Sequence, residues 1–130
     1  MKEIHSRNFI IETNYFILIY SISDYQSFKY AKELLPKINK IKEERYEISH
    51  IVLVCNKCDL PQSMHEVPHK LGQNLANEWN IPFIVTSAKH SINIFEAFEW
   101  IILENYKPTP IQKQDVIQIN HQCCTCCAIV

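Results

Sequence analysis

The residues of this chain that are best suited to chemistry lie in two short polar segments. The first segment holds Asn56, Lys57 and Asp59, and the second holds Ser87, Ala88 and Lys89. A carboxylate such as that of Asp59 can accept two neighbouring donors in a charge-assisted fork, because it has two acceptor oxygens. Guanine offers such a pair, N1–H and the exocyclic amine at C2, whereas adenine has no amine at C2. Asp59 therefore predicts a site for a flat, donor-rich ring such as guanine.

The remaining candidates have predicted roles around the same ring. Asn56 can either tie the neighbouring loops together or reach the base. The methylene stems of Lys57 and Lys89 can lie across the ring, and the backbone N–H of Ala88 can donate to O6. Each of these residues alone is more typical of an ordinary turn, so the prediction depends on both segments occurring together.

Three apolar runs predict the strands that position these segments. Tyr15–Ile22, Ile51–Cys55 and Phe83–Thr86 are rich in β-branched and aromatic residues, as buried strands are. Helical patterns separate them, so the fold class is α/β, with parallel strands joined by right-handed crossovers. Parallel strands end at the same edge of a sheet, where open α/β sheets bind ligands. The two polar segments should converge at that edge.

The first predicted helix follows the strand at Tyr15–Ile22. Ser23 and Gln26 match a capping box. An apolar stripe with helical spacing follows and is expected to face the sheet: Phe28, Ala31, Leu35, Ile38 and Ile41. Pro36 lies inside this stripe. Because proline removes a backbone hydrogen bond, Pro36 predicts a kink or an early end of the helix. Residues 37–47 are charged and are expected to be solvated.

Three further helices are predicted. A short one fits within residues 1–13, another begins near Pro68 and closes at Asn80, and the last runs from about Asn93 to Asn105. The side chains predicted to face the sheet are Leu71, Leu75, Ala76 and Trp79 in the second of these helices and Ile94, Phe98, Ile101 and Ile102 in the last.

Composition excludes several classes of function. The chain has 130 residues, enough for one domain with a real core. Its single glycine, Gly72, excludes a glycine-rich phosphate loop and a dinucleotide fingerprint, which both need several glycines. A net charge of −1 gives no reason to expect nucleic acid as a partner. With no apolar run of membrane-spanning length and no signal-peptide core, the chain is expected to be cytosolic.

The cysteines fall into two groups with different predicted roles. Cys55 and Cys58 flank the first polar segment, and Cys58 is expected to be inert. The others are Cys123, Cys124, Cys126 and Cys127. Their spacing is too tight for a zinc site, and no metal site is predicted. The last four residues, CAIV, fit the C-a-a-X pattern for prenylation of Cys127, and the other three cysteines of this group are candidates for palmitoylation as a second membrane signal.

The two polar segments, NKCD at 56–59 and TSAK at 86–89, resemble the guanine-specificity motifs of small GTPases. Their flanks, FILIYSISD, QSF, VLVCNKCDL and IPFIVTSAK, are similar to the Ras family over about residues 4–106. The resemblance implies a parallel three-layer α/β/α fold of the P-loop GTPase (Ras-like) type, truncated to its last three strands and three helices. Residues 1–106 would form a partial small GTPase domain, and residues 107–130 a flexible tail with a lipidation motif.

The resemblance also implies that several functional parts are missing. The family's P-loop with its Lys and Ser/Thr, the switch threonine that reaches Mg²⁺, and the Asp-x-x-Gly with its glutamine have no counterparts in this sequence. Those parts hold the phosphates and position the attacking water. We therefore expect no catalytic residues, weak binding of GTP or GDP through the base alone, and Mg²⁺ only in a complete form.

Two hypotheses from different classes follow. In the first, the chain is the carboxyl-terminal part of a Ras-like GTPase, a signalling switch on the cytoplasmic face of a membrane, with the plasma membrane favoured. In the second, it is a short, non-catalytic, lipid-anchored adaptor or decoy that presents its helices to a protein partner. Neither hypothesis identifies effectors or regulators. In both, the strand at Tyr15–Ile22 is expected to lie at an open sheet edge that favours aggregation.

Overall fold

Three parallel strands form the centre of the computed structural model, which describes residues 7–105. The strands are β1 (Tyr15–Ser21), β2 (His50–Asn56) and β3 (Phe83–Val85), in the sheet order β1-β2-β3. Both neighbouring pairs are parallel. The predicted α/β class and parallel sheet are confirmed. β1 lies at an edge of the sheet, as expected, and within residues 7–105 no strand pairs with its outer side.

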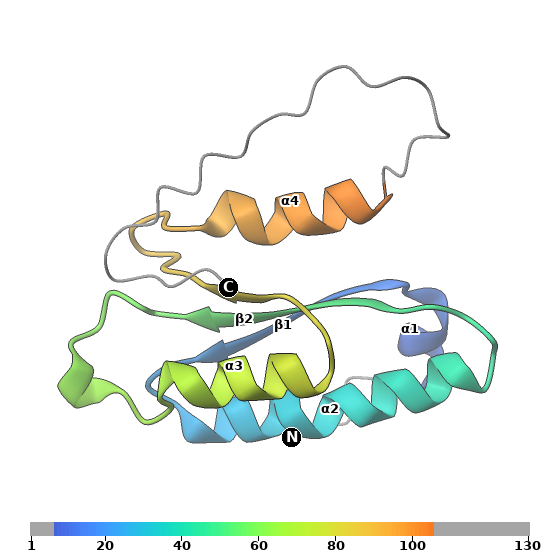
Figure 1. The fold of residues 1–130 in the computed structure, drawn as a ribbon, viewed down its shortest axis with the longest axis horizontal. Helices are drawn as coiled ribbons and strands as arrows, with labels where there is room; N and C mark the ends of the chain where they lie inside the picture. Colours follow the sequence, from blue (N-terminus) through green and yellow to red (C-terminus); the bar gives the residue numbers. More distant parts are fainter. Residues whose placement is uncertain (1–6, 106–130) are drawn as a thin grey trace, which may run out of the picture.

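Helices cover both faces of this sheet. They are α1 (Arg7–Glu12), α2 (Tyr25–Glu43), α3 (His69–Glu78) and α4 (Ile94–Asn105), and a short 3₁₀ helix spans Gln62–Met64. Figure 1 shows α2 and α3 on one face of the sheet and α4 on the other, with α1 leading into β1. The described residues therefore form three layers, helices, sheet and helix.

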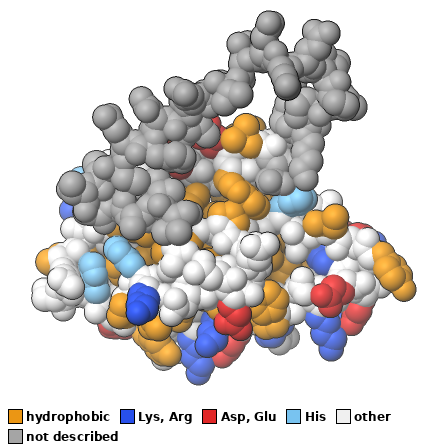
Figure 2. All heavy atoms as spheres, in the orientation of Figure 1, with side chains coloured by type: hydrophobic (Ala, Val, Ile, Leu, Met, Phe, Trp, Pro, Cys, Tyr) orange, Lys and Arg blue, Asp and Glu red, His pale blue; other side chains and the backbone are white. Residues whose placement is uncertain are grey.

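The face of the sheet toward α2 and α3, here called the α2–α3 face, carries most of the core. Alternate residues of each strand point into it, so Leu18 of β1 lies beside Leu53 of β2, and Leu53 beside Phe83 of β3. Nineteen buried residues belong to this cluster, including Leu35 of α2 and Leu75 of α3. Charged side chains of both signs lie along the molecule's lower edge in Figure 2, where Figure 1 places α2.

The single glycine of the chain lets α3 approach the sheet closely. A Cβ atom at Gly72 would lie 2.7 Å from ring carbons of Phe83 and would also collide with the hydroxyl of Tyr20. Tyr20 is almost fully buried, and this burial, followed by the neighbouring Cys55 thiol, raises the pKa of its hydroxyl. Gly72 is thus required by packing at this point of the α2–α3 face.

The opposite face, here called the α4 face, is only partly covered. Its buried cluster has four members, against which Trp100 and Ile101 of α4 pack: Val52, Val54, Ile84 and Ala97. Ile19 alternates with the inward-facing Leu18 and Tyr20, so it points to the α4 face, and it is 59% exposed. The exposed apolar side chains of α4 are Phe95, Phe98, Ile102 and Leu103. Among the described residues, nothing covers this apolar surface.

The amino-terminal cap of α2 differs from the predicted capping box. The cap is Asp24, whose Oδ1 accepts hydrogen bonds from the backbone N–H groups of Gln26 and Ser27 at 2.9 and 3.2 Å. The Ser23 hydroxyl instead forms a hydrogen bond with the Ser21 hydroxyl. Asp and Ser are both good capping residues, and a carboxylate also interacts favourably with the positive end of the helix dipole.

The predicted early end of α2 at Pro36 is wrong, because the helix continues to Glu43. Pro36 lies on the exposed side of the helix, so water can satisfy the carbonyl that its missing N–H leaves unpaired. Ile38 is 1% exposed and faces the core, as the apolar stripe predicts, but the predicted solvation of residues 37–47 is wrong at Lys42, which is also 1% exposed. Lys42 Nζ donates to Ile11 O, Asn14 Oδ1 and Glu47 Oε2 at 2.8–3.0 Å.

The later helices follow the predicted ranges but differ in which side chains face inward. In α3, Leu75 and Ala76 are buried and Asn80 closes the helix with φ of 51°, as predicted, but Leu71 is exposed. In α4, Phe98 and Ile102 are exposed instead of facing the sheet, and Ala97 is buried instead. α4 is apolar on several sides, so periodicity alone does not determine the side that packs against the sheet.

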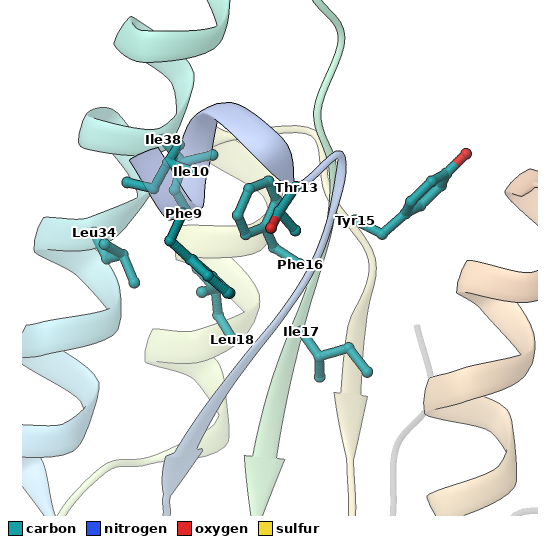
Figure 3. Close-up of a pocket in the computed structure, with 9 residues that line it drawn as sticks. All are labelled: Phe9, Ile10, Thr13, Tyr15, Phe16, Ile17, Leu18, Leu34 and Ile38. Atoms are coloured by element: carbon teal, nitrogen blue, oxygen red, sulfur yellow. The ribbon is translucent and has the colours of Figure 1, made fainter. Parts of the chain in front are cut away.

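A hollow of about 210 Å³ lies at the edge of the sheet beside β1. Figure 3 shows its lining, which comes from α1, β1 and α2: Phe9, Ile10, Thr13, Tyr15, Phe16, Ile17, Leu18, Leu34 and Ile38. Nearly all of these side chains are apolar, and none carries a charge. The hollow therefore offers no charged group that could bind an ion.

Candidate functional site

Asn56, the last residue of β2, links the two polar segments. Its Oδ1 accepts hydrogen bonds from the Thr86 hydroxyl and from the Ala88 backbone N–H, both at 3.1 Å. The backbone adds two further bonds, from Thr86 N–H to Cys55 O at 2.7 Å and from Cys58 N–H to Thr86 O at 3.0 Å. One amide oxygen thus joins two loops that lie 30 residues apart in the sequence.

The carboxylate of Asp59 is oriented by the second loop. The Ser87 hydroxyl donates to Asp59 Oδ1 at 2.5 Å. The same hydroxyl accepts a hydrogen bond from the His90 backbone N–H at 3.3 Å, an arrangement that leaves its own hydrogen for Asp59. The other carboxylate oxygen, Oδ2, lies 3.7 Å from His90 Nε2. The Asp59 side chain is 15% exposed, so it is largely fixed while retaining access to solvent.

The surroundings of Asp59 favour its charged form. The hydrogen bond from Ser87 lowers the pKa of the Asp59 carboxyl, and the nearby His90 and Lys89 act in the same direction. Asp59 is therefore an ionised group that only accepts hydrogen bonds at neutral pH. Burial, in contrast, raises the pKa of the Cys55 thiol to about 11. Cys55 is thus a protonated core residue and not a nucleophile.

A depression of about 260 Å³ lies beside these groups. Its lining residues are Asn56, Lys57, Asp59, Leu60, Ala88 and Lys89. Lys57 has φ of 66°, in the left-handed region, which turns the chain sharply after β2. Its side chain is exposed, as is that of Lys89. A carboxylate and two lysine stems around a shallow hollow suit a flat ring with polar edges.

The second loop is closed by its own hydrogen bonds. Ser87 and Ile92 exchange backbone hydrogen bonds of 3.1 and 2.9 Å, and Asn93 Nδ2 donates to Val85 O at 2.9 Å. Ser91 and Asn93 have φ of 55° and 54°, so the chain reverses within a few residues. This turn fixes Ser87 and His90 relative to β3.

The structure brings all six predicted site residues to one edge of the sheet. Asn56 ties the loops together, which is the first of its two predicted roles. The N–H of Ala88 donates to Asn56 in this structure, so its bond to O6 of a base stays a prediction. Sequence reasoning missed the roles of Thr86, although it belongs to the TSAK segment, and of His90, for which only the position directly after that segment was a signal.

The predicted lipidation sites, Cys127 and Cys123, Cys124 and Cys126, lie outside the described residues. Within residues 7–105, no helix combines the length and the apolar character needed to cross a membrane. In the same range, no three His, Cys, Asp or Glu side chains gather closely enough to hold a metal ion.

Comparison with known proteins gives two findings. The family model described as "Ras family" matches residues 3–107. A curated relative, "Ras-like protein 2" of Mucor circinelloides f. lusitanicus, is 34% identical over 115 residues, which make up 88% of this chain and 57% of that protein. The chain therefore spans little more than half the length of this relative.

Proposed function

Because the chain belongs to the Ras family of small GTPases, we propose that the two joined loops bind the guanine base of GTP or GDP. The observation that carries the proposal is the oriented Asp59 carboxylate at the wall of the depression. Its two oxygens match the N1–H and amine of guanine, which are the donors that distinguish this base from adenine.

Each neighbouring group has a part in this recognition. Ser87 orients the carboxylate, and Asn56 holds the second loop beside it. The stems of Lys57 and Lys89 cover the faces of the ring. Donation from the Ala88 N–H to O6 requires its bond to Asn56 to be shared or exchanged when the base binds.

Binding through the base alone is expected to be weak. A forked pair of hydrogen bonds contributes roughly 1–3 kcal/mol of discrimination, and about 4 kcal/mol corresponds to a millimolar dissociation constant. GTP hydrolysis, Mg²⁺ binding and the action of a signalling switch are proposed only for a form that also holds the phosphates. The sequence has a single glycine and so offers no glycine-rich loop for them.

Nucleoside titrations test this proposal without any contribution from phosphates. Backbone amide NMR spectra of the full chain are recorded with guanosine, inosine or adenosine. The amide of Ala88 should shift with guanosine at lower concentration than with inosine, which lacks the amine. Equal responses to guanosine and inosine would exclude the role given to Asp59.

The substitution Asp59→Asn replaces one acceptor oxygen of the proposed fork with an amide N–H donor. An amide N–H suits the 2-oxo group of xanthine, so guanosine should bind roughly tenfold more weakly and xanthosine more tightly than to the wild type. Asp24→Asn is the matched control, because Asp24 caps α2 away from the depression. An unchanged preference for guanosine in Asp59→Asn would contradict the proposal.

A membrane anchor is the second part of the proposed function. Prenylation of Cys127, with palmitoylation at Cys123, Cys124 or Cys126, would hold the chain on the cytoplasmic face of a membrane, with the plasma membrane favoured. Intact mass after expression in a prenylating cell should show one isoprenoid on the wild type and none on Cys127→Ser. An unmodified wild-type chain would overturn this part.

The exposed apolar surface of α4 supports the alternative of a lipid-anchored adaptor or decoy, because such surfaces usually contact proteins. The adaptor and the nucleotide binder differ in the titration described above. A folded chain that binds no nucleoside, yet is lipidated, would favour the adaptor.

A further inference from the structure

We propose that His90 is a positioning residue for Asp59 that makes guanine binding weaker at acidic pH. The inference rests on the proposed function, since it concerns the same carboxylate. A protonated imidazole pairs with Oδ2 of Asp59 and competes with the amine of guanine for that oxygen. A neutral imidazole leaves both oxygens of the carboxylate to the base.

His90 is connected to both oxygens of Asp59. Its Nε2 lies 3.7 Å from Oδ2. Its backbone N–H donates to the Ser87 hydroxyl, which in turn donates to Oδ1. The same residue therefore helps to orient the carboxylate and presents a titratable ring to the oxygen on the other side.

The position of His90 is set by the turn of the second loop. His90 lies between Ser87 and Ile92, which exchange two backbone hydrogen bonds. Ser91, the next residue, has a positive φ that reverses the chain. The His90 side chain is 54% exposed, so protons reach the ring freely from solvent. Histidine is the side chain whose ordinary change of charge falls between pH 5 and 8.

Other charged and titratable groups lie at this edge. Lys57 and Lys89 line the same depression, and the positive charge of Lys89 acts on Asp59 in the same direction as His90. His65 is another histidine in the segment that follows β2, and its ring contacts groups other than Asp59. Its Nε2 lies 2.8 Å from Leu60 O, and its ring packs near that of His69. Among the described residues, His90 is therefore the histidine whose ring lies next to the Asp59 carboxylate.

The test measures guanosine binding to the full chain at pH 5.5 and pH 8.0 by the NMR titration. A nucleoside is used because nucleotide phosphates themselves titrate in this range. Wild-type binding should be roughly two- to fivefold weaker at pH 5.5, as expected for competition with an exposed ion pair. His90→Gln keeps the backbone N–H but cannot become charged, so its binding should be the same at both pH values.

Matched variants separate His90 from the other histidine. His65→Gln retains a side-chain N–H for Leu60 O and should keep the pH response of the wild type. His90→Ala is a second variant that also keeps the backbone N–H and should lose the response. A response that persists in His90→Gln and His90→Ala, or that disappears in His65→Gln, would overturn the inference.

The same data distinguish failure of this inference from failure of the proposed function. If the wild type does not prefer guanosine to inosine at pH 8.0, the proposed function itself fails. If it prefers guanosine equally strongly at both pH values, the base site stands and only the role of His90 is wrong.

Discussion

The two faces of the sheet differ in how completely they are covered. The α2–α3 face buries nineteen residues in one cluster and leaves no room for a single methyl group at Gly72. The α4 face buries four residues and exposes Ile19 together with much of the apolar surface of α4. The difference is one of coverage, since neighbouring residues of similar size on β1, Leu18 and Ile19, are 7% and 59% exposed.

The contrast shows which face of the sheet forms a complete core from the described residues alone. The α2–α3 face has the packing of a finished core. The α4 face has the composition of a core but lacks a second layer over β1, and large exposed apolar surfaces mark contact sites. The candidate site lies at the edge where both faces end, and none of the hydrogen bonds described for it involves a residue of α4.

The largest expected effect compares truncations of two neighbouring residues on β1. Leu18→Ala removes buried carbon atoms from the α2–α3 face and should lower the free energy of unfolding by ~2–5 kcal/mol. Ile19→Ala removes atoms that are already exposed and should change it by less than about 0.5 kcal/mol. Urea denaturation of both variants measures the difference. Similar losses in both would mean that the α4 face is covered in solution, and the contrast would fail.

A smaller effect is expected from Gly72→Ala. The added methyl group would collide with the Phe83 ring and the Tyr20 hydroxyl, and overpacking of this kind costs about 1–3 kcal/mol. Asn74→Ala on the exposed side of α3 is the control, which should be neutral or slightly stabilising because alanine favours helix. A Gly72→Ala variant as stable as the wild type would show that Phe83 and Tyr20 can shift to make room for the methyl group.

The smallest change in stability is expected on α4, where the effect should appear in association instead. Phe98→Ser should alter the free energy of unfolding by less than about 0.5 kcal/mol. It should reduce self-association in sedimentation velocity, because it interrupts the exposed apolar surface. Met64→Ser, a similarly exposed residue in the 3₁₀ helix, serves as the control. Equal sedimentation of the two variants would mean that the exposed apolar surface of α4 does not drive association.

Much of this arrangement could be predicted from the sequence because the strands have strong local signals. The runs that became β1, β2 and β3 are apolar on both faces, and the parallel order then placed NKCD and TSAK at one edge. The loops could be brought together by topology alone. The bonds within them could not, since the engagement of Ala88 N–H by Asn56 and the approach of His90 to Asp59 depend on turn geometry.

The errors have physical causes in individual residues. Pro36 does not end α2, because packing of Leu35 and Ile38 against the sheet holds the helix together despite the missing hydrogen bond. Lys42 was expected in solvent, yet three oxygen acceptors allow its burial. The inward side of α4 could not be chosen, because it depends on which parts of the sheet the helix covers.

The shortness of β3 has a consequence for local opening of the fold. Three residues, Phe83–Val85, join the second loop and α4 to the rest of the sheet. A base that contacts both loops would hold them together and stabilise the pairing of β3 with β2, because a ligand favours the form that binds it. Amide hydrogen exchange in β3 and α4 should therefore slow with guanosine, while exchange in α2 should not change.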